Sequence, residues 1–258
     1  MKSWAIVRHS VRQVIGNLGA ALRISLLLYA VQVVVGLAMD RAMSRTAVGQ
    51  GPDGADPMAA MQTLAGPGLL SALVALVAYI WIAVAWHRYV LTVEVSPGLV
   101  PEFNAARLLG YFGTFLQLMA IFSVAAASFA VLGSTVLAVA SPAVANAILP
   151  LLPLIVILLF SGPGLRLATV LPGVALEPGH RLAEGWRATA GEVSTLYGVG
   201  LIWTVALLLI RGISLAVIPD VWWIGLLWAI PVQWIEMMVG ISLLTTLYGH
   251  YIQKRPLI

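Results

Sequence analysis

The chain has 258 residues, of which 61% are hydrophobic and only 9% are charged, and its formal net charge is +4. Soluble domains carry roughly 25% charged residues, so this composition excludes an ordinary soluble fold and indicates a polytopic membrane protein. The absence of cysteine rules out disulfides and cysteine-ligated metal sites. The basic residues are scattered singly between apolar runs, so we expect them to meet phospholipid headgroups and expect no nucleic-acid binding.

The N-terminal segment predicts an amphipathic helix over residues 4–20. Its valines and isoleucines recur on one face, while Arg8, His9 and Arg12 lie elsewhere. This pattern is typical of a helix lying in the headgroup layer. The alternative is a solvated leader to the first span. No convincing small-residue cleavage site follows, so a cleaved signal is not expected.

Apolar runs predict the first two membrane spans at about 22–39 and 68–92. The segment between them, about 40–67, is rich in Gly, Pro, Asp and Ala. Such a composition favours a mobile outer loop.

Four more spans are predicted at about 108–139, 146–171, 194–217 and 224–251. The third is long enough that it must tilt or project beyond the hydrocarbon. The fourth begins with two prolines and ends with the sequence SGPG, so we expect it to be bent or interrupted at both places. Residues 178–190 again have an amphipathic, interfacial pattern.

The predicted fold is therefore an all-α membrane protein. It forms a single integral membrane domain over 1–258, with six transmembrane helices and two or three amphipathic interfacial helices. Basic residues at similar spacing, Arg23, Arg107 and Arg187, precede the first, third and fifth spans. They suggest three repeated helical hairpins, although an apolar composition produces such coincidences easily.

Lysine and arginine placement predicts the orientation. Most of these residues fall on the side that holds both termini, and basic residues favour the cytoplasmic side of a membrane. We therefore expect a multi-pass protein of the bacterial cytoplasmic (inner) membrane with both termini in the cytoplasm.

No familiar catalytic pattern is present. The chain lacks a Walker lysine loop, GxSxG and HExxH, and its four histidines lie in separate segments without a carboxylate at ligand spacing. We accordingly predict no enzymatic activity, no catalytic residue, no metal site and no cofactor.

Two ionised residues lie inside the last two spans, Arg211 and Glu236. A carboxylate at mid-span costs on the order of 2.5–3.5 kcal/mol, so Glu236 must be paired, hydrogen-bonded or protonated. Arg211 is the expected partner because both residues lie roughly two to three turns inside the outer ends of their helices. Alternatively, Arg211 extends toward the interface and Glu236 bonds Gln117, Thr114 or Thr135 of the third span. The supporting polar stripe comprises Gln117 on the third span, Thr204 and Ser214 on the fifth and Gln233 on the sixth.

This pair has two interpretations. The functional one is a proton or ion relay, or a site for an anionic group at Arg211. The structural one is a polar clamp that fixes the register of two helices that pack stripe to stripe.

A second set of basic and imidazole side chains is predicted at the cytoplasmic boundary. Gathered in one bundle, they would form a cationic rim for phospholipid headgroups or a protein partner, although ordinary positive-inside charge is an alternative explanation. The set is His87, Arg88, Arg166, Arg181, Arg187 and His250.

Two stretches carry a family resemblance. Residues 164–201 hold an arginine, an LPxxAL turn and a WRxTxG motif before the next span, and residues 85–94 read AWHRYVLTVE. Together they resemble uncharacterised bacterial polytopic inner-membrane proteins related to the membrane domain of some glycerophosphoryl diester phosphodiesterases. The resemblance implies a six-helix architecture and a link to lipids. It implies no reaction, because no soluble domain with metal-binding carboxylates is present.

The function predicted from the sequence is non-enzymatic. We expect a scaffold or accessory subunit that binds phospholipids, a larger membrane complex or a second copy of itself. The alternative is a small transporter or channel whose polar pathway passes Glu236 and Arg211.

Overall fold

The computed structural model describes residues 2–49, 57–94, 98, 100–177, 179–218 and 221–257. The chain is 88% helical, and its described residues contain no strand. Among the described residues, six helices are long and apolar enough to cross a membrane, so the chain has the build of a multi-pass membrane protein. The predicted all-α class with six spans is confirmed.

Each predicted span except the fourth lies within one longer helix, and the fourth is divided among shorter elements. In chain order they are α1 (Lys2–Ile15), α2 (Leu18–Gly49), α3 (Pro57–Thr92), α4 (Ala105–Val139), α5 (Pro142–Ile148), a 3-10 turn (Leu149–Leu151), α6 (Leu152–Ala168), α7 (Leu171–Leu176), α8 (Leu182–Ala188), a second 3-10 turn (Ala190–Glu192), α9 (Val193–Val217) and α10 (Trp222–Tyr251).

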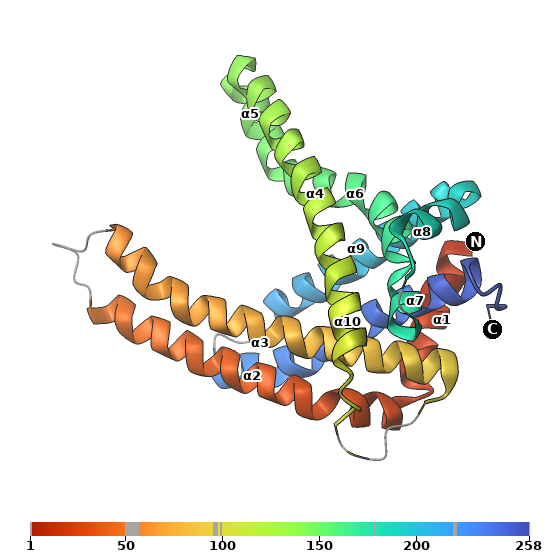
Figure 1. Ribbon diagram of the computed structural model, residues 1–258. Coiled ribbons are helices and arrows are strands. Elements are labelled where there is room, and N and C mark those ends of the chain that lie inside the picture. The colour runs from red at the N-terminus through yellow and green to blue at the C-terminus, as the bar shows by residue number, and fades with distance from the viewer. Residues whose placement is uncertain are drawn as a thin grey trace.

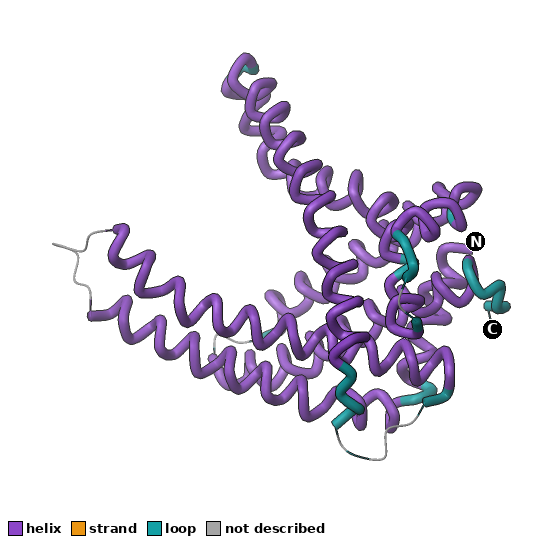
Figure 2. The backbone as a smooth tube through the Cα atoms, viewed as in Figure 1, coloured by secondary structure: helices purple, strands orange, loops and turns teal. Residues whose placement is uncertain are grey.

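The α2–α3 and α4–α6 hairpins diverge from a common base (Figure 1). The α2–α3 hairpin stays paired, whereas the α4–α6 hairpin projects away from it. The base holds α1, α7 and α8, and both chain ends lie there. Figure 2 shows that most of the described loops also lie at this end.

Helix α1 is inserted between α9 and α10 at the base. Ile6 and Val7 are buried against Leu196 of α9 and Leu247 of α10. On the next turn, the Ser10 hydroxyl donates to Thr246 Oγ1 at 3.0 Å. The helix is amphipathic as predicted, but its apolar face contacts protein, and the two helices expected to pack stripe to stripe are held apart there by α1.

The main core surrounds the C-terminal half of α3. Ile82 and Trp86 are completely buried and pack with Met238 and Ile241 of α10. Short helix α7 completes this core, since five of its six residues are buried. Hydrophobic burial at the base therefore fixes how the three hairpins start, while their outer parts are left to lipid or to partners.

Two predicted irregularities are wrong in detail. Helices α2 and α3 take up most of the predicted loop 40–67, and only residues 50–56 lie outside the described part. The fourth span is interrupted near its prolines by the 3-10 turn Leu149–Leu151. However, α6 runs without a break through SGPG. Gly162 lies against the Tyr197 ring, where a Cβ would be too close, so this glycine permits helix contact.

Candidate functional site

Arg211 on α9 and Glu236 on α10 form an ion pair. The distance from Arg211 Nη2 to Glu236 Oε2 is 2.7 Å. The two side chains differ in environment, since Arg211 is 53% exposed and Glu236 only 13%. Glu236 Oε1 is buried and has no hydrogen-bond partner among the residues that the structure describes. One carboxylate oxygen thus accepts a hydrogen bond from Arg211, and the other accepts none from the described residues.

Neighbouring polar groups join the same helices to each other and to α2. The Trp228 indole donates to Ser214 Oγ at 2.8 Å, which ties α10 to α9 near the pair. On the other side of α10, Trp234 Nε1 donates to Ser25 Oγ at 2.7 Å and the Tyr29 hydroxyl donates to the Ile230 carbonyl at 2.8 Å. Helix α10 is therefore held on both sides, and Arg211 is the most open member of this network.

The other residues of the predicted stripe do not enclose the pair. Thr204 is buried within α9, whereas Gln233 is exposed on α10. Gln117 is exposed on α4, which packs on α3, α6 and α7. The structure thus contains the Arg211 alternative for Glu236 and not the Gln117 alternative.

His87 is not part of a cationic rim, which corrects the prediction. It is completely buried, with Nδ1 2.8 Å from Thr245 Oγ1 and Nε2 3.2 Å from the Tyr111 hydroxyl. The ring therefore links α3, α4 and α10 inside the core. No headgroup can reach it.

Arg166 is also turned inward, which is a second correction. Its side chain lies over the Trp186 ring, with Cζ 3.6 Å from the ring centroid. Nη2 donates to the Trp186 carbonyl at 2.8 Å, and Nε donates to Thr189 Oγ1 at 3.2 Å. The arginine, tryptophan and threonine of the motif in 164–201 thus form one cluster that fixes α8 against α6.

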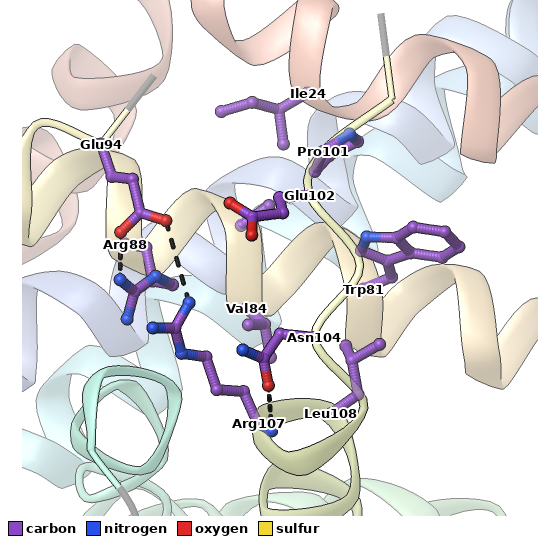
Figure 3. A pocket seen from close by; sticks show the side chains of 11 residues that line it. Ile24, Trp81, Val84, Arg88, Glu94, Pro101, Glu102, Asn104, Arg107 and Leu108 are labelled. Carbon is purple, nitrogen blue, oxygen red and sulfur yellow. Dashed lines mark hydrogen bonds and ion pairs between the residues drawn. The ribbon is translucent and has the colours of Figure 1, made fainter. Parts of the chain in front are cut away.

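Arg88 lies near the C-terminal end of α3 and makes polar contacts with two other segments. Nη1 donates to the Ala175 and Leu176 carbonyls at the end of α7, at 3.2 and 3.3 Å. Nη2 bonds Glu94, and Arg107 of α4 approaches the same carboxylate at 3.9 Å (Figure 3). The Arg88 hydrogen bond, helped by the charge of Arg107, lowers the pKa of Glu94.

Three predicted rim residues lie near the surface. Arg181 and Arg187 are exposed on the α8 segment. His250 is half-buried, and its Nδ1 donates to the Arg255 carbonyl at 3.0 Å. Next to Arg181, the hydrogen bond from His180 lowers the pKa of Glu184. Only part of the predicted rim is therefore available to headgroups.

Sequence reasoning missed the convergence of Glu94, Arg107 and Trp81 around Arg88. A signal was present, because Trp81 and Arg88 are seven residues apart in the span 68–92, and this spacing puts them on the same face of a helix. Comparison with family models, with curated proteins and with solved structures found no match.

Proposed function

We propose that the protein is a non-enzymatic scaffold or accessory subunit, and that its α9–α10 hairpin docks a helix of a larger membrane complex. The observation that carries this proposal is the open position of the ion pair, with Arg211 53% exposed within a membrane-spanning helix. A charge that faces hydrocarbon is unfavourable. A polar or acidic side chain on a partner helix would stabilise it.

The wide apolar surface supports protein contacts within the bilayer. The buried residues of α4 are Tyr111, Thr114 and Leu118, all in its first half. The second half carries Ser123, Ala127 and Ser134 among other small residues, and such spacing permits close approach of another helix. The hairpin that projects in Figure 1 therefore offers a long face that this chain does not cover.

We also propose a location in the bacterial cytoplasmic membrane with both termini in the cytoplasm. The bias of Lys and Arg toward the side of the termini supports this orientation. The two ends also adjoin, since the Lys2 ammonium lies 5.0 Å from the centroid of the Tyr251 ring. Arg181 and Arg187 would then face anionic headgroups. The relation of this chain to the membrane domain of glycerophosphoryl diester phosphodiesterases stays a prediction.

The accessory role is tested by extracting the protein with its native lipids into nanodiscs and identifying what accompanies it by mass spectrometry. We expect a protein partner in fixed stoichiometry, which Arg211→Met loses. The control Arg187→Met removes the same charge from exposed helix α8 and should keep the partner. Absence of a stoichiometric partner, or equal retention by Arg211→Met, would refute the docking role.

A transporter or channel is the second candidate, and one observation favours it. Glu236 Oε1 is buried and unpaired, as expected of a carboxylate that takes up a proton or cation. In proteoliposomes, Glu236→Gln should then abolish ion or proton flux while the folded protein remains abundant. If the wild-type protein shows no flux above empty liposomes, this candidate fails.

A further inference from the structure

A small cavity lies at the inner end of the first two hairpins, between α2, α3 and the segment that leads into α4. Its volume is about 70 Å³. Ile24, Val84 and Leu108 form apolar parts of its wall, while Trp81, Arg88 and Glu102 supply polar groups (Figure 3). The cavity therefore combines a charged side with a hydrocarbon side, as expected at the boundary of a membrane.

Three polar groups of this cavity lack partners. Trp81 Nε1 and Arg88 Nε are buried N–H donors without a hydrogen bond to any described residue. The Glu102 carboxylate makes no hydrogen bond or ion pair with any residue that the structure describes. A buried donor without a partner is unfavourable by about 1–3 kcal/mol, so a ligand with matching groups would be stabilised here.

The two arginines keep further donors available. Each guanidinium has five N–H donors in a fixed fork. Arg88 uses Nη1 and Nη2 on carbonyls and on Glu94, and Arg107 approaches Glu94 through Nη1. The remaining donors, with the Trp81 indole, are suited to the oxygens of a phosphate ester.

The charge balance selects the class of ligand. Arg88 and Arg107 are matched by Glu94 and Glu102, so the lining carries no net charge. A purely anionic ligand would meet the free Glu102 carboxylate and be repelled. A zwitterion brings an anion for the donors and a cation for Glu102.

We propose that this cavity binds the headgroup of a zwitterionic phospholipid with a primary ammonium, of the phosphoethanolamine type. The phosphate accepts hydrogen bonds from Trp81, Arg88 and Arg107, and the ammonium donates to Glu102. The apolar wall leads the acyl chains toward α2 and α3. A primary ammonium is preferred over a quaternary one because only the former donates hydrogen bonds to a carboxylate.

An exposed aromatic ring lies beside the cavity. The ring of Trp81, which lines the cavity, and the ring of Phe103 meet edge to face with centroids 5.1 Å apart, and Phe103 is 61% exposed. The proposal rests on the membrane location given above and is independent of partner docking at Arg211.

The test is native mass spectrometry of the delipidated protein in detergent, titrated separately with phosphatidylethanolamine, phosphatidylcholine and phosphatidylglycerol. We expect phosphatidylethanolamine to bind at least tenfold more tightly than either of the others. Glu102→Gln should lower the affinity for phosphatidylethanolamine to that for phosphatidylcholine, since a hydrogen bond to a charged group is worth about tenfold in affinity. Glu177→Gln, the same change at an exposed residue outside the cavity, should keep the preference.

Two further arms separate the sources of the chemistry. Trp81→Phe removes the indole N–H but keeps an aromatic ring, and it should weaken the binding of all three lipids alike. Free phosphoethanolamine should compete only weakly, and inorganic phosphate more weakly still. Equal binding of the three lipids, an unchanged preference in Glu102→Gln, or competition by free phosphoethanolamine as strong as by the lipid would each overturn the proposal. None of these outcomes bears on the nanodisc partner of Arg211.

Discussion

Arg211 and Glu236 are joined at 2.7 Å, yet α1 lies between their helices at the base. The pair therefore bridges a hairpin whose members are not packed together along their whole length. Direct contact between the described parts of α9 and α10 is sparse, so the contribution of the pair to stability should be measurable.

Breaking this ion pair should lower stability. Glu236→Gln and Arg211→Met each leave one ionised or polar group unpaired, and we expect losses of about 1–2 kcal/mol, because the exposure of Arg211 reduces the effect below that of a fully buried pair. The double variant should recover part of the loss, with a coupling of about 0.5–2 kcal/mol. Equilibrium unfolding in mixed micelles measures all four proteins. Strictly additive losses, or wild-type stability in both single variants, would show that the pair does not act as a clamp.

The spans were predictable because a long apolar run has few alternatives to a membrane helix. The pairing of consecutive spans into hairpins was predictable from the polar or proline-containing segments that separate them. In contrast, the insertion of α1 depends on Ile6 and Ser10 finding Leu196 and Thr246, residues at the far end of the chain. An amphipathic pattern is equally satisfied by lipid headgroups and by protein, so the sequence could not choose between them.

The cationic rim was only partly predictable for a similar reason. The positive-inside rule assigns a basic residue to one side of the membrane but says nothing of the direction of its side chain. Arg166 turns inward because Trp186 and Thr189 offer a ring and a hydroxyl, and Arg88 because α7 ends in front of it. His87 is buried by Tyr111 and Thr245, which come from two other helices.

The Arg166 cluster should not tolerate lysine. Arg166→Lys removes the planar group that stacks on Trp186 and bonds Thr189 simultaneously. We expect a loss of about 1–3 kcal/mol because a buried fork is replaced by a point charge. Thermal unfolding of the detergent-solubilised protein measures it. Arg187→Lys, one residue after Trp186 but exposed, is the control and should unfold like the wild type.

Removing the His87 imidazole should destabilise the core. His87→Ala creates a cavity and leaves Tyr111 and Thr245 without this partner, for an expected loss of about 2–4 kcal/mol. Tyr111→Phe removes only one hydroxyl and should cost about 1 kcal/mol. The same unfolding assay ranks the variants. His250→Ala at the half-buried C-terminal end of α10 should have a smaller effect, and an equal effect would contradict the central role of His87.

Acid should weaken the Arg88–Glu94–Arg107 contact. The folded-state pKa of Glu94 lies below its ordinary value of 4.5, mainly through the Arg88 hydrogen bond. Its stabilising contribution is therefore complete above about pH 4.5 and is lost as the pH falls through the lowered folded pKa. Unfolding midpoints measured between pH 7 and pH 3 should fall more steeply for the wild type than for Glu94→Gln or Arg88→Gln. Identical slopes in all three would show that Glu94 is not held by this contact.

Close contact of α6 and α9 should depend on two glycines. A Cβ on Gly162 would lie 2.6 Å from the Tyr197 ring, and one on Gly200 would lie 2.5 Å from Ser161 Cβ. Gly200→Ala should cost about 1–3 kcal/mol, because overpacking at a tight crossing forces the helices apart. Gly162→Ala should cost less, since an aromatic ring can turn aside.

The control is Gly212→Ala on the same helix α9, where no described atom lies within 4 Å of the added Cβ. It should leave stability unchanged or raise it slightly, because alanine favours a helix over glycine. If Gly200→Ala and Gly212→Ala behave alike, α6 and α9 are not in contact at this point, and SGPG would not serve as a packing surface.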